Sequence, residues 1–297
     1  AMKMKINEFL KNHGTNSATY ALVIFGYVIM QSLSSGGHLS RSVNGYLIPI
    51  CCYIVLAVSL NLVVGISGEL SLGHAGFMCV GAYLGGKLAV VLAPSLGNGP
   101  LLLILCLLFG GLVSTAFGFI IGLPALRLKG DYLAIATLGF AEIIRIFAQN
   151  MTITGGAAGL SGIPKMTSWP MLWAFTVGTL VLILAFIKSS HGRACIAIRE
   201  DEIAAESMGV NTTKYKVMAF AIGAFFAGIG GALYASTFYI LKPTTFGFMK
   251  SIEILMIVVL GGMGSMTGTV VASAVLAIIT MLLQSFSELR MVLYAIM

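Results

Sequence analysis

The segment KSSHGRACIAIREDEIAAESMGVNTTKYK, residues Lys188–Lys216, is the one long charged interval in this chain. Its acidic residues are Glu200, Asp201, Glu202 and Glu206, four of the ten in the whole sequence. Apolar runs long enough to cross a bilayer as helices lie on both sides of it. The pattern predicts a polar helix displayed between two membrane spans, as a membrane protein needs if a soluble partner must act on it.

The composition predicts an integral membrane protein. Hydrophobic residues make up 58% of the 297 residues and charged residues only 9%, whereas a soluble domain has about 25% charged residues. The formal net charge of +7 is explained by basic residues in cytoplasmic loops, so nucleic-acid binding is not expected. The five cysteines lack CxxC spacing and lie mostly in apolar runs, which predicts buried thiols rather than disulfides or metal ligands.

The predicted fold is all-α, a polytopic bundle of transmembrane helices in a single domain over residues 1–297. The apolar runs that predict spans are 18–34, 46–66, 75–93, 100–123, 132–149, 169–187, 215–240 and 251–285. A last run, from Leu289 to Met297, is too short to cross alone. Basic residues precede the first run and follow the fourth and the sixth, which predicts that these places and the N-terminus are cytoplasmic.

Two segments predict broken helices. They are GISGELSLGHAGF (Gly65–Phe77) and GGMGSMTG (Gly261–Gly268), and each puts Gly and Ser among apolar residues at membrane depth. Broken backbone there is tolerated only inside protein or along a watery cavity, and paired interruptions often mark the substrate path of a transporter. The alternative is two glycine-rich contacts between close-packed helices. The candidate path residues in these segments are Glu69, Ser71, His74, Gly261, Gly262, Gly264 and Ser265.

A pair of opposite charges, Glu142 and Arg145, lies within the run 132–149. Residues three apart on a helix can face one another. If the helix starts at Asp131, Glu142 lies about 16 Å along it, near the middle of the membrane. The pair is either a neutralising contact that orders the bundle or part of the substrate path. Lys87, Lys242 and Lys250 lie near span ends and are expected to extend toward the membrane surface.

The sequence predicts no catalytic residue and no metal site. It has no GxxxxGK[ST] loop, no HExxH, no GxSxG and no Cys/His set with metal-ligand spacing. Glu69 and His74 share one segment, but a lone His beside small residues is expected to be a hydrogen-bonding strut rather than half of a catalytic pair.

The acidic residues of the charged interval predict a short helix at the membrane surface, over about 197–209. Acids gather where its first turn would lie, and negative charge stabilises the N-terminus of a helix. Gly209 can end the helix as a C-cap. The alternative is a solvated loop with no partner.

The segment EIAAESMG (Glu202–Gly209) resembles the EAA motif of ABC importer permeases, whose coupling helix docks in a groove of the ATPase subunit. Further segments are similar to permeases of branched-chain amino acid importers, and to the LivM-type subunit more than to the LivH-type. They are SGELSLGHAGFMCVGAY (67–83), ALRLKGDYLAIATLGFAEIIRI (125–146), TGGAAGLSGIP (154–164), GRACIAIREDEIAAESMGV (192–210) and IVVLGGMGSMTG (257–268). The similarity covers nearly the whole chain after about residue 45.

The resemblance implies a permease subunit of an ATP-driven importer for leucine, isoleucine and valine, in a bacterial or archaeal plasma membrane. The implied partners are a LivH-type permease, two ATPase subunits that bind ATP and Mg²⁺, and an extracytoplasmic substrate-binding protein. The residues to which it assigns ATPase coupling are Arg199, Glu200, Asp201, Glu202, Ala204, Ala205, Glu206 and Gly209. The family normally ends in a further apolar stretch and a basic tail, which predicts that the sequence is truncated after Met297.

Two alternatives remain at this level. Similar permeases carry urea, short amides or other amino acids. A stand-alone secondary transporter or channel would explain the spans and the broken helices, but not the polar helix.

Overall fold

The computed structural model describes residues 41–238 and 240–282. In chain order its elements are α2 (Arg41–Asn61), the π-helix η1 (Leu62–Ile66), α3 (His74–Leu96), α4 (Pro100–Ala125), α5 (Asp131–Asn150), the 3-10 helices η2 (Thr152–Thr154) and η3 (Gly156–Ala158), β1 (Leu160–Ser161), α6 (Trp169–Lys188), α7 (Ser190–Glu200), α8 (Glu202–Ser207), α9 (Thr212–Ala235), β2 (Ile240–Leu241), the 3-10 helix η4 (Pro243–Phe246), α10 (Phe248–Gly261) and α11 (Met266–Leu282). The predicted span 18–34 and the run from Leu289 lie outside the described residues.

Within this part of the chain, five helical stretches are long and apolar enough to cross a membrane. They are Pro49–Ile66, His74–Leu96, Pro100–Ala125, Trp169–Lys188 and Thr212–Ala235. Each matches a predicted span, so the prediction of a helical, multi-pass membrane protein is confirmed. The β structure of the described residues is one short antiparallel pair, in which Leu160 faces Leu241 and Ser161 faces Ile240.

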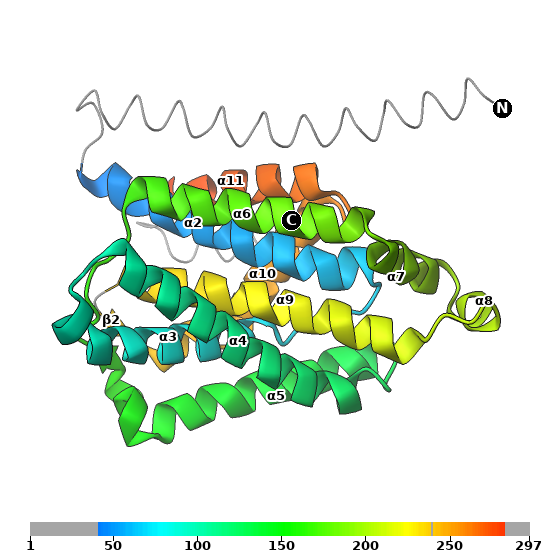
Figure 1. Cartoon of the computed structure of the whole chain (residues 1–297), viewed down its shortest axis with the longest axis horizontal. Coiled ribbons are helices and arrows are strands. Elements are labelled where there is room, and N and C mark those ends of the chain that lie inside the picture. Colours follow the sequence, from blue (N-terminus) through cyan, green and yellow to red (C-terminus); the bar gives the residue numbers. More distant parts are fainter. Residues whose placement is uncertain (1–40, 239, 283–297) are drawn as a thin grey trace.

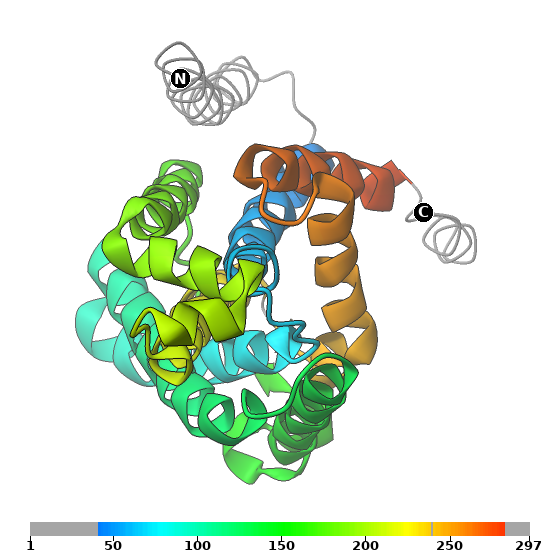
Figure 2. The same cartoon turned by 90° about the vertical axis from the view of Figure 1, so that its right-hand side faces the viewer.

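The long helices run roughly side by side, with α7 and α8 at one end of the bundle and β2 at the other (Figure 1). We call these the α8 end and the β end. Viewed from the α8 end, α2 and α3 lie inside a ring that includes α4, α5, α10, α11 and α6 (Figure 2). The burial of the spans is consistent with this arrangement. In α2 and α3, 83% and 67% of the span is buried, and in α9 78% is buried, against 39% for α4 and for α6.

The core helices approach closely because they present glycines to one another. A Cβ atom added at Gly81 on α3 would lie 2.2 Å from the carbonyl oxygen of Gly228 on α9. One added at Gly231 would lie 2.1 Å from the carbonyl oxygen of Met78. Small residues at helix contacts permit this approach, which brings many atoms into dispersion contact where no hydrophobic effect drives association. The five cysteines are free and buried, as predicted.

Both predicted breaks are present. In the first, α2 ends in the π-helix Leu62–Ile66, a non-helical stretch follows, and α3 begins at His74. In the second, the apolar run 251–285 is divided between α10 and α11. Gly262 and Gly264 lie in that turn with φ of +88° and +87°, a conformation that residues with a Cβ rarely adopt.

The helix predicted over about 197–209 is divided in the structure. Helix α7 ends at Glu200, and α8 covers only Glu202–Ser207. Asp201 is extended between them, and its side chain accepts hydrogen bonds from the backbone N–H groups of Ile203 and Ala204, both 3.0 Å. It is therefore the N-cap of α8, a role that aspartate favours. Gly209 (φ +83°) follows α8 and closes its last turn, as expected.

Candidate functional site

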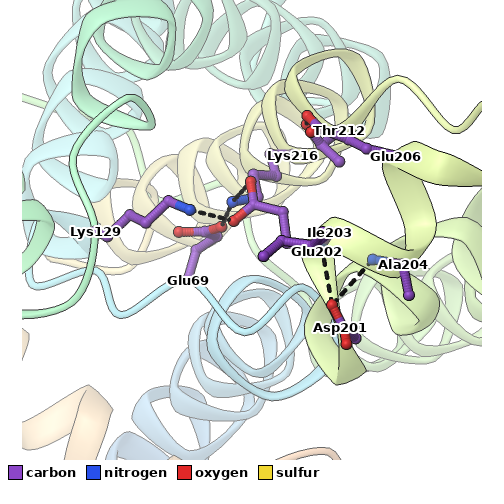
Figure 3. Close-up of polar contacts among 9 residues, drawn as sticks. All are labelled: Glu69, Lys129, Asp201, Glu202, Ile203, Ala204, Glu206, Thr212 and Lys216. Atoms are coloured by element: carbon purple, nitrogen blue, oxygen red, sulfur yellow. Dashed lines mark hydrogen bonds and ion pairs between the residues drawn. The ribbon is translucent and has the colours of Figure 1, made fainter.

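A cluster of four charged side chains ties α8 to the bundle (Figure 3). The two carboxylate oxygens of Glu202 bind Lys129 and Lys216, each at 2.8 Å. Lys216 Nζ also binds Glu69 Oε1 at 2.8 Å. We call these four residues the Lys216 cluster. It joins the first break, the α4–α5 turn, α8 and the first turns of α9.

The Lys216 cluster is graded from buried to exposed. The side chains of Lys216 and Glu69 are 8% and 10% exposed, that of Glu202 is 28% exposed, and that of Lys129 is 76% exposed. Removing one partner of a buried ion pair leaves an uncompensated charge and typically costs about 3–5 kcal/mol. Hydrogen bonds from Lys129 and Lys216 hold the pKa of Glu202 below its ordinary value. Burial raises the pKa of Glu69, and Lys216 offsets part of that rise.

The lowered pKa of Glu202 predicts a pH-dependent contribution to stability. The ionised Glu202 carboxylate binds the two lysines in the folded state but not in the unfolded state. Its contribution to the free energy of unfolding is therefore complete above pH 4.5, its ordinary pKa, and is lost as the pH falls through the lower pKa of the folded state. We expect Glu202→Gln to lower the thermal midpoint of the detergent-solubilised protein at pH 7, and the difference from wild type to shrink below pH 4.5. A difference that grew on acidification would contradict this assignment.

Arg199 makes a second connection between the α7–α8 region and the bundle. Its Nη1 atom donates to the carbonyl oxygen of Gly65 at 2.5 Å. Its side chain also covers Gly68, where an added Cβ atom would lie 2.6 Å from Arg199 Cγ. The other side of the guanidinium pairs with Glu200, whose side chain is 66% exposed. Helix α7 therefore contacts the first break directly.

Buried Asn61 joins the two breaks to one another. Its Oδ1 atom accepts from the backbone N–H of Gly264 at 2.8 Å, and its Nδ2 atom donates to Thr269 Oγ1 at 2.8 Å and to the carbonyl oxygen of Ser265 at 3.2 Å. Beside it, a Cβ atom added at Gly65 would lie 2.2 Å from Gly264 N. The two breaks thus meet at the α8 end, next to Arg199. The sequence prediction missed Asn61, although an amide inside an apolar run was a sign of such a role.

The Asn61 contacts predict a measurable loss of stability. Asn61→Ala leaves the N–H of Gly264 without its acceptor, and an unsatisfied buried group costs about 1–3 kcal/mol. We expect a lower thermal midpoint in detergent. Asn150→Ala is the control, because Asn150 is exposed and bonds only within its own helix. Equal midpoints for the two variants would show that the hydrogen bonds of Asn61 do not stabilise the junction of the two breaks.

The remaining candidates of the first break are buried, and His74 and Glu69 bond to different partners. His74 and Ser71 are each 2% exposed. His74 Nε2 bonds Ser59 Oγ at 2.8 Å, whereas Glu69 bonds Lys216. Ser71 Oγ accepts from the N–H of Gly73 at 3.4 Å. In the second break, a Cβ atom added at Gly261 would lie 2.6 Å from the Cα atom of Thr269 on α11. This glycine therefore permits the close packing of α10 against α11.

Glu142 and Arg145 form an ion pair on α5, and Glu142 also contacts the start of α10. Glu142 Oε2 lies 2.6 Å from Arg145 Nε, and Glu142 Oε1 accepts from the backbone N–H of Phe248 at 3.1 Å. A carboxylate at a helix N-terminus is stabilised by the helix dipole. This geometry supports the ordering role. The side chains are still 31% and 22% exposed, so the pair also remains open to a partner or a substrate.

Lys250 does not extend toward the membrane surface, which corrects the expectation from its position. Its side chain is 13% exposed and binds Glu253 at 3.0 Å and the hydroxyl of Tyr53. Tyr53 in turn donates to Glu253 at 2.9 Å. The spacing of three between Lys250 and Glu253, the same as in the pair on α5, was the available sign of this second ion pair.

Residues 42–297 match the family described as "Branched-chain amino acid transport system / permease component". The chain belongs to this family. It is 40% identical over 276 residues to the high-affinity branched-chain amino acid transport system permease protein LivM of Salmonella typhimurium, covering 81% of this chain and 63% of that protein. It is 38% identical to LivM of Escherichia coli K12, with the same coverage. It is also 26% identical over 247 residues to the E. coli K12 permease protein LivH, covering 76% of this chain and 80% of LivH. The chain thus spans 63% of the length of these LivM relatives. No solved structure matches it.

Proposed function

We propose that this chain is a transmembrane permease subunit of an ATP-driven importer for branched-chain amino acids, with its α8 end in the cytoplasm. Its partners would be a LivH-type permease, two ATPase subunits that bind ATP and Mg²⁺, and an extracytoplasmic substrate-binding protein. The location would be a bacterial or archaeal plasma membrane. Family membership and the names of the LivM and LivH relatives support this proposal.

The observation that carries the proposal is the form of α8. Ile203 on α8 and Met208, the residue directly after this helix, are 80% and 84% exposed. On its inner side Glu202 joins the Lys216 cluster and Ala205 is buried. Exposed apolar side chains rimmed by polar ones indicate a site for a protein partner. The helix is therefore suited to dock in a groove of an ATPase subunit while it is held to the bundle.

The contacts behind α8 suggest how movement reaches the membrane. Closure of the ATPase subunits on ATP would displace α7 and α8 together. Arg199 would transmit this displacement to Gly65, and Glu202 would transmit it to Lys216 and Glu69. Since Gly65 and Asn61 contact the α10–α11 turn, the same displacement would reach both breaks and reshape the path between the two permeases.

The docking role predicts the effect of Ile203→Asp. A charge in place of the apolar anchor would be buried in the ATPase groove without a partner, so we expect binding of the ATPase subunits to fall at least about tenfold. The thermal midpoint of the chain alone should not change, because the side chain is exposed. Ile153→Asp is the control, since Ile153 is 57% exposed and lies at the β end. Undiminished binding by Ile203→Asp would exclude this docking surface.

The assembled importer tests the function itself. We expect ATP-dependent leucine uptake into proteoliposomes that contain all the partners, with competition by valine and isoleucine but not by urea. Uptake without the ATPase subunits would instead identify a stand-alone transporter or channel. Competition by urea alone would overturn the substrate assignment.

We propose that the partly exposed pair on α5 contributes to the substrate path. A zwitterionic amino acid presents one carboxylate and one ammonium group, which Arg145 and Glu142 could meet in turn. The other residues that we place along the path, through the two breaks, are Glu69, Ser71, His74, Gly261, Gly262, Gly264 and Ser265.

A further inference from the structure

An open apolar groove of about 760 Å³ runs along α9 between α4 and α6. Figure 1 looks onto this side of the molecule, with α9 between the other two helices. The walls include Leu112 and Leu123 of α4 and Phe186 of α6, and α9 contributes Met218 and Phe225. The groove is separate from the Lys216 cluster, the two breaks and the ion pair on α5.

The length of the groove along the helices is close to the thickness of one leaflet of a bilayer. Along α4 it extends from Leu112 to Leu123, which is about 16 Å at 1.5 Å per residue. Along α9 it extends from Thr213 to Phe226, which is about 20 Å at the same rise per residue. Half of the hydrocarbon core is about 15 Å thick. Since α4 ends at Ala125 and α9 begins at Thr212, the groove occupies the half of the bundle next to the α8 end.

The mouth of the groove is positively charged. Lys214 is the one charged residue of its lining, and it makes no ion pair with the described part of the chain. Lys188, the last residue of α6, lies two positions beyond the lining residue Phe186. Two carboxylates of this end already have partners: Glu202 binds two lysines, and Glu206 accepts from the hydroxyl of Thr212 at 2.8 Å.

We propose that this groove binds an anionic phospholipid of the leaflet at the α8 end. One acyl chain lies along α9 between α4 and α6, and the phosphate lies at Lys214. The alkyl and aromatic walls of the groove match the acyl chain, and its length matches one leaflet. The unpaired ammonium group of Lys214 matches the phosphate of the headgroup. The lipid braces the base of α9, the helix that carries Lys216.

Photo-crosslinking of the purified chain in phosphatidylcholine nanodiscs tests this inference. A trace of phosphatidylglycerol with a diazirine on one acyl chain is added, and the adducts are mapped by mass spectrometry. We expect them to concentrate on Leu112–Leu123 and Lys214–Phe226. Lys214→Glu should reduce them at least about fivefold, because one lysine near the surface contributes about 1 kcal/mol to attraction for anionic lipid. Lys242→Glu is the control, since Lys242 is exposed at the β end.

A second variant, Met218→Trp, fills the groove and keeps Lys214. It should also lose the adducts, and it preserves the test if Lys214→Glu does not fold. Equal labelling by diazirine phosphatidylcholine, or even labelling over all exposed apolar faces, would overturn the proposal. Loss of the adducts in excess glycerol phosphate would show a phosphate site without lipid and would also overturn it. Absence of adducts from the groove would overturn it as well. Transport is not measured, so failure here leaves the proposed function standing.

Discussion

Gly231→Ala is expected to destabilise this protein by about 3 kcal/mol, the upper part of the usual range for overpacking a core. The new Cβ atom would lie 2.1 Å from the carbonyl oxygen of Met78 and 2.9 Å from the backbone nitrogen of Ala82. Both are backbone atoms of α3, so no side chain can rotate away. Helices α3 and α9 would have to separate, and their shared dispersion contacts would be lost. The measurement is the thermal midpoint in detergent.

Gly178→Ala is the matched control for this prediction. Gly178 lies within α6, and an added Cβ atom there meets nothing within 4 Å. Alanine is the better helix former by about 1 kcal/mol, so this variant should be as stable as wild type or more stable. If the two variants melted together, the close approach of α3 and α9 would not be a determinant of stability.

Glu202→Lys is expected to abolish coupled transport. In the wild type the two acids and two lysines of the Lys216 cluster cancel. In the variant one acid faces three lysines, so α8 is repelled from Lys129 and Lys216. Since Ile203 and Met208 are unchanged, the ATPase subunits should still bind and hydrolyse ATP. We expect leucine uptake per ATP hydrolysed to fall at least about tenfold, because removing a partner of a buried charge commonly costs more than 1.4 kcal/mol, the free energy of one factor of ten.

A rescue variant separates this electrostatic effect from a general defect. Glu202→Lys combined with Lys129→Glu restores two acids and two lysines and allows residues 129 and 202 to pair again. We expect it to recover a large part of the uptake. Normal uptake by the single variant, or no recovery by the double variant, would count against transmission through the Lys216 cluster.

The transmembrane helices could be predicted because the thickness of the bilayer sets the length of each apolar run. The run 169–187 became Trp169–Lys188, and the run 46–66 ended at Ile66. The second break was visible because glycines cluster inside an apolar run. The division at Asp201 was not predicted. The run of acids around it predicts one helix with all of these acids in its first turn, whereas Asp201 is the N-cap of α8.

The contacts that build the site could not be predicted from the sequence. Asn61 and Gly264 are 203 positions apart, and Lys129 and Glu202 are 73 apart. Which residues meet over such separations depends on how the helices pack, and apolar runs do not encode that. Local spacing did identify Glu142 with Arg145, because residues three apart must be neighbours on a helix.

The contact between Gly65 and Gly264 has a practical consequence for anyone who recombines this permease with a relative. A chimera that takes one of the two breaks from a LivH-type parent and keeps the other would join two surfaces that are shaped for different neighbours. Exchange of the stretches around 61–77 and 257–269 as a matched set should preserve the junction, whereas exchange of either alone should yield protein that is degraded in the host cell.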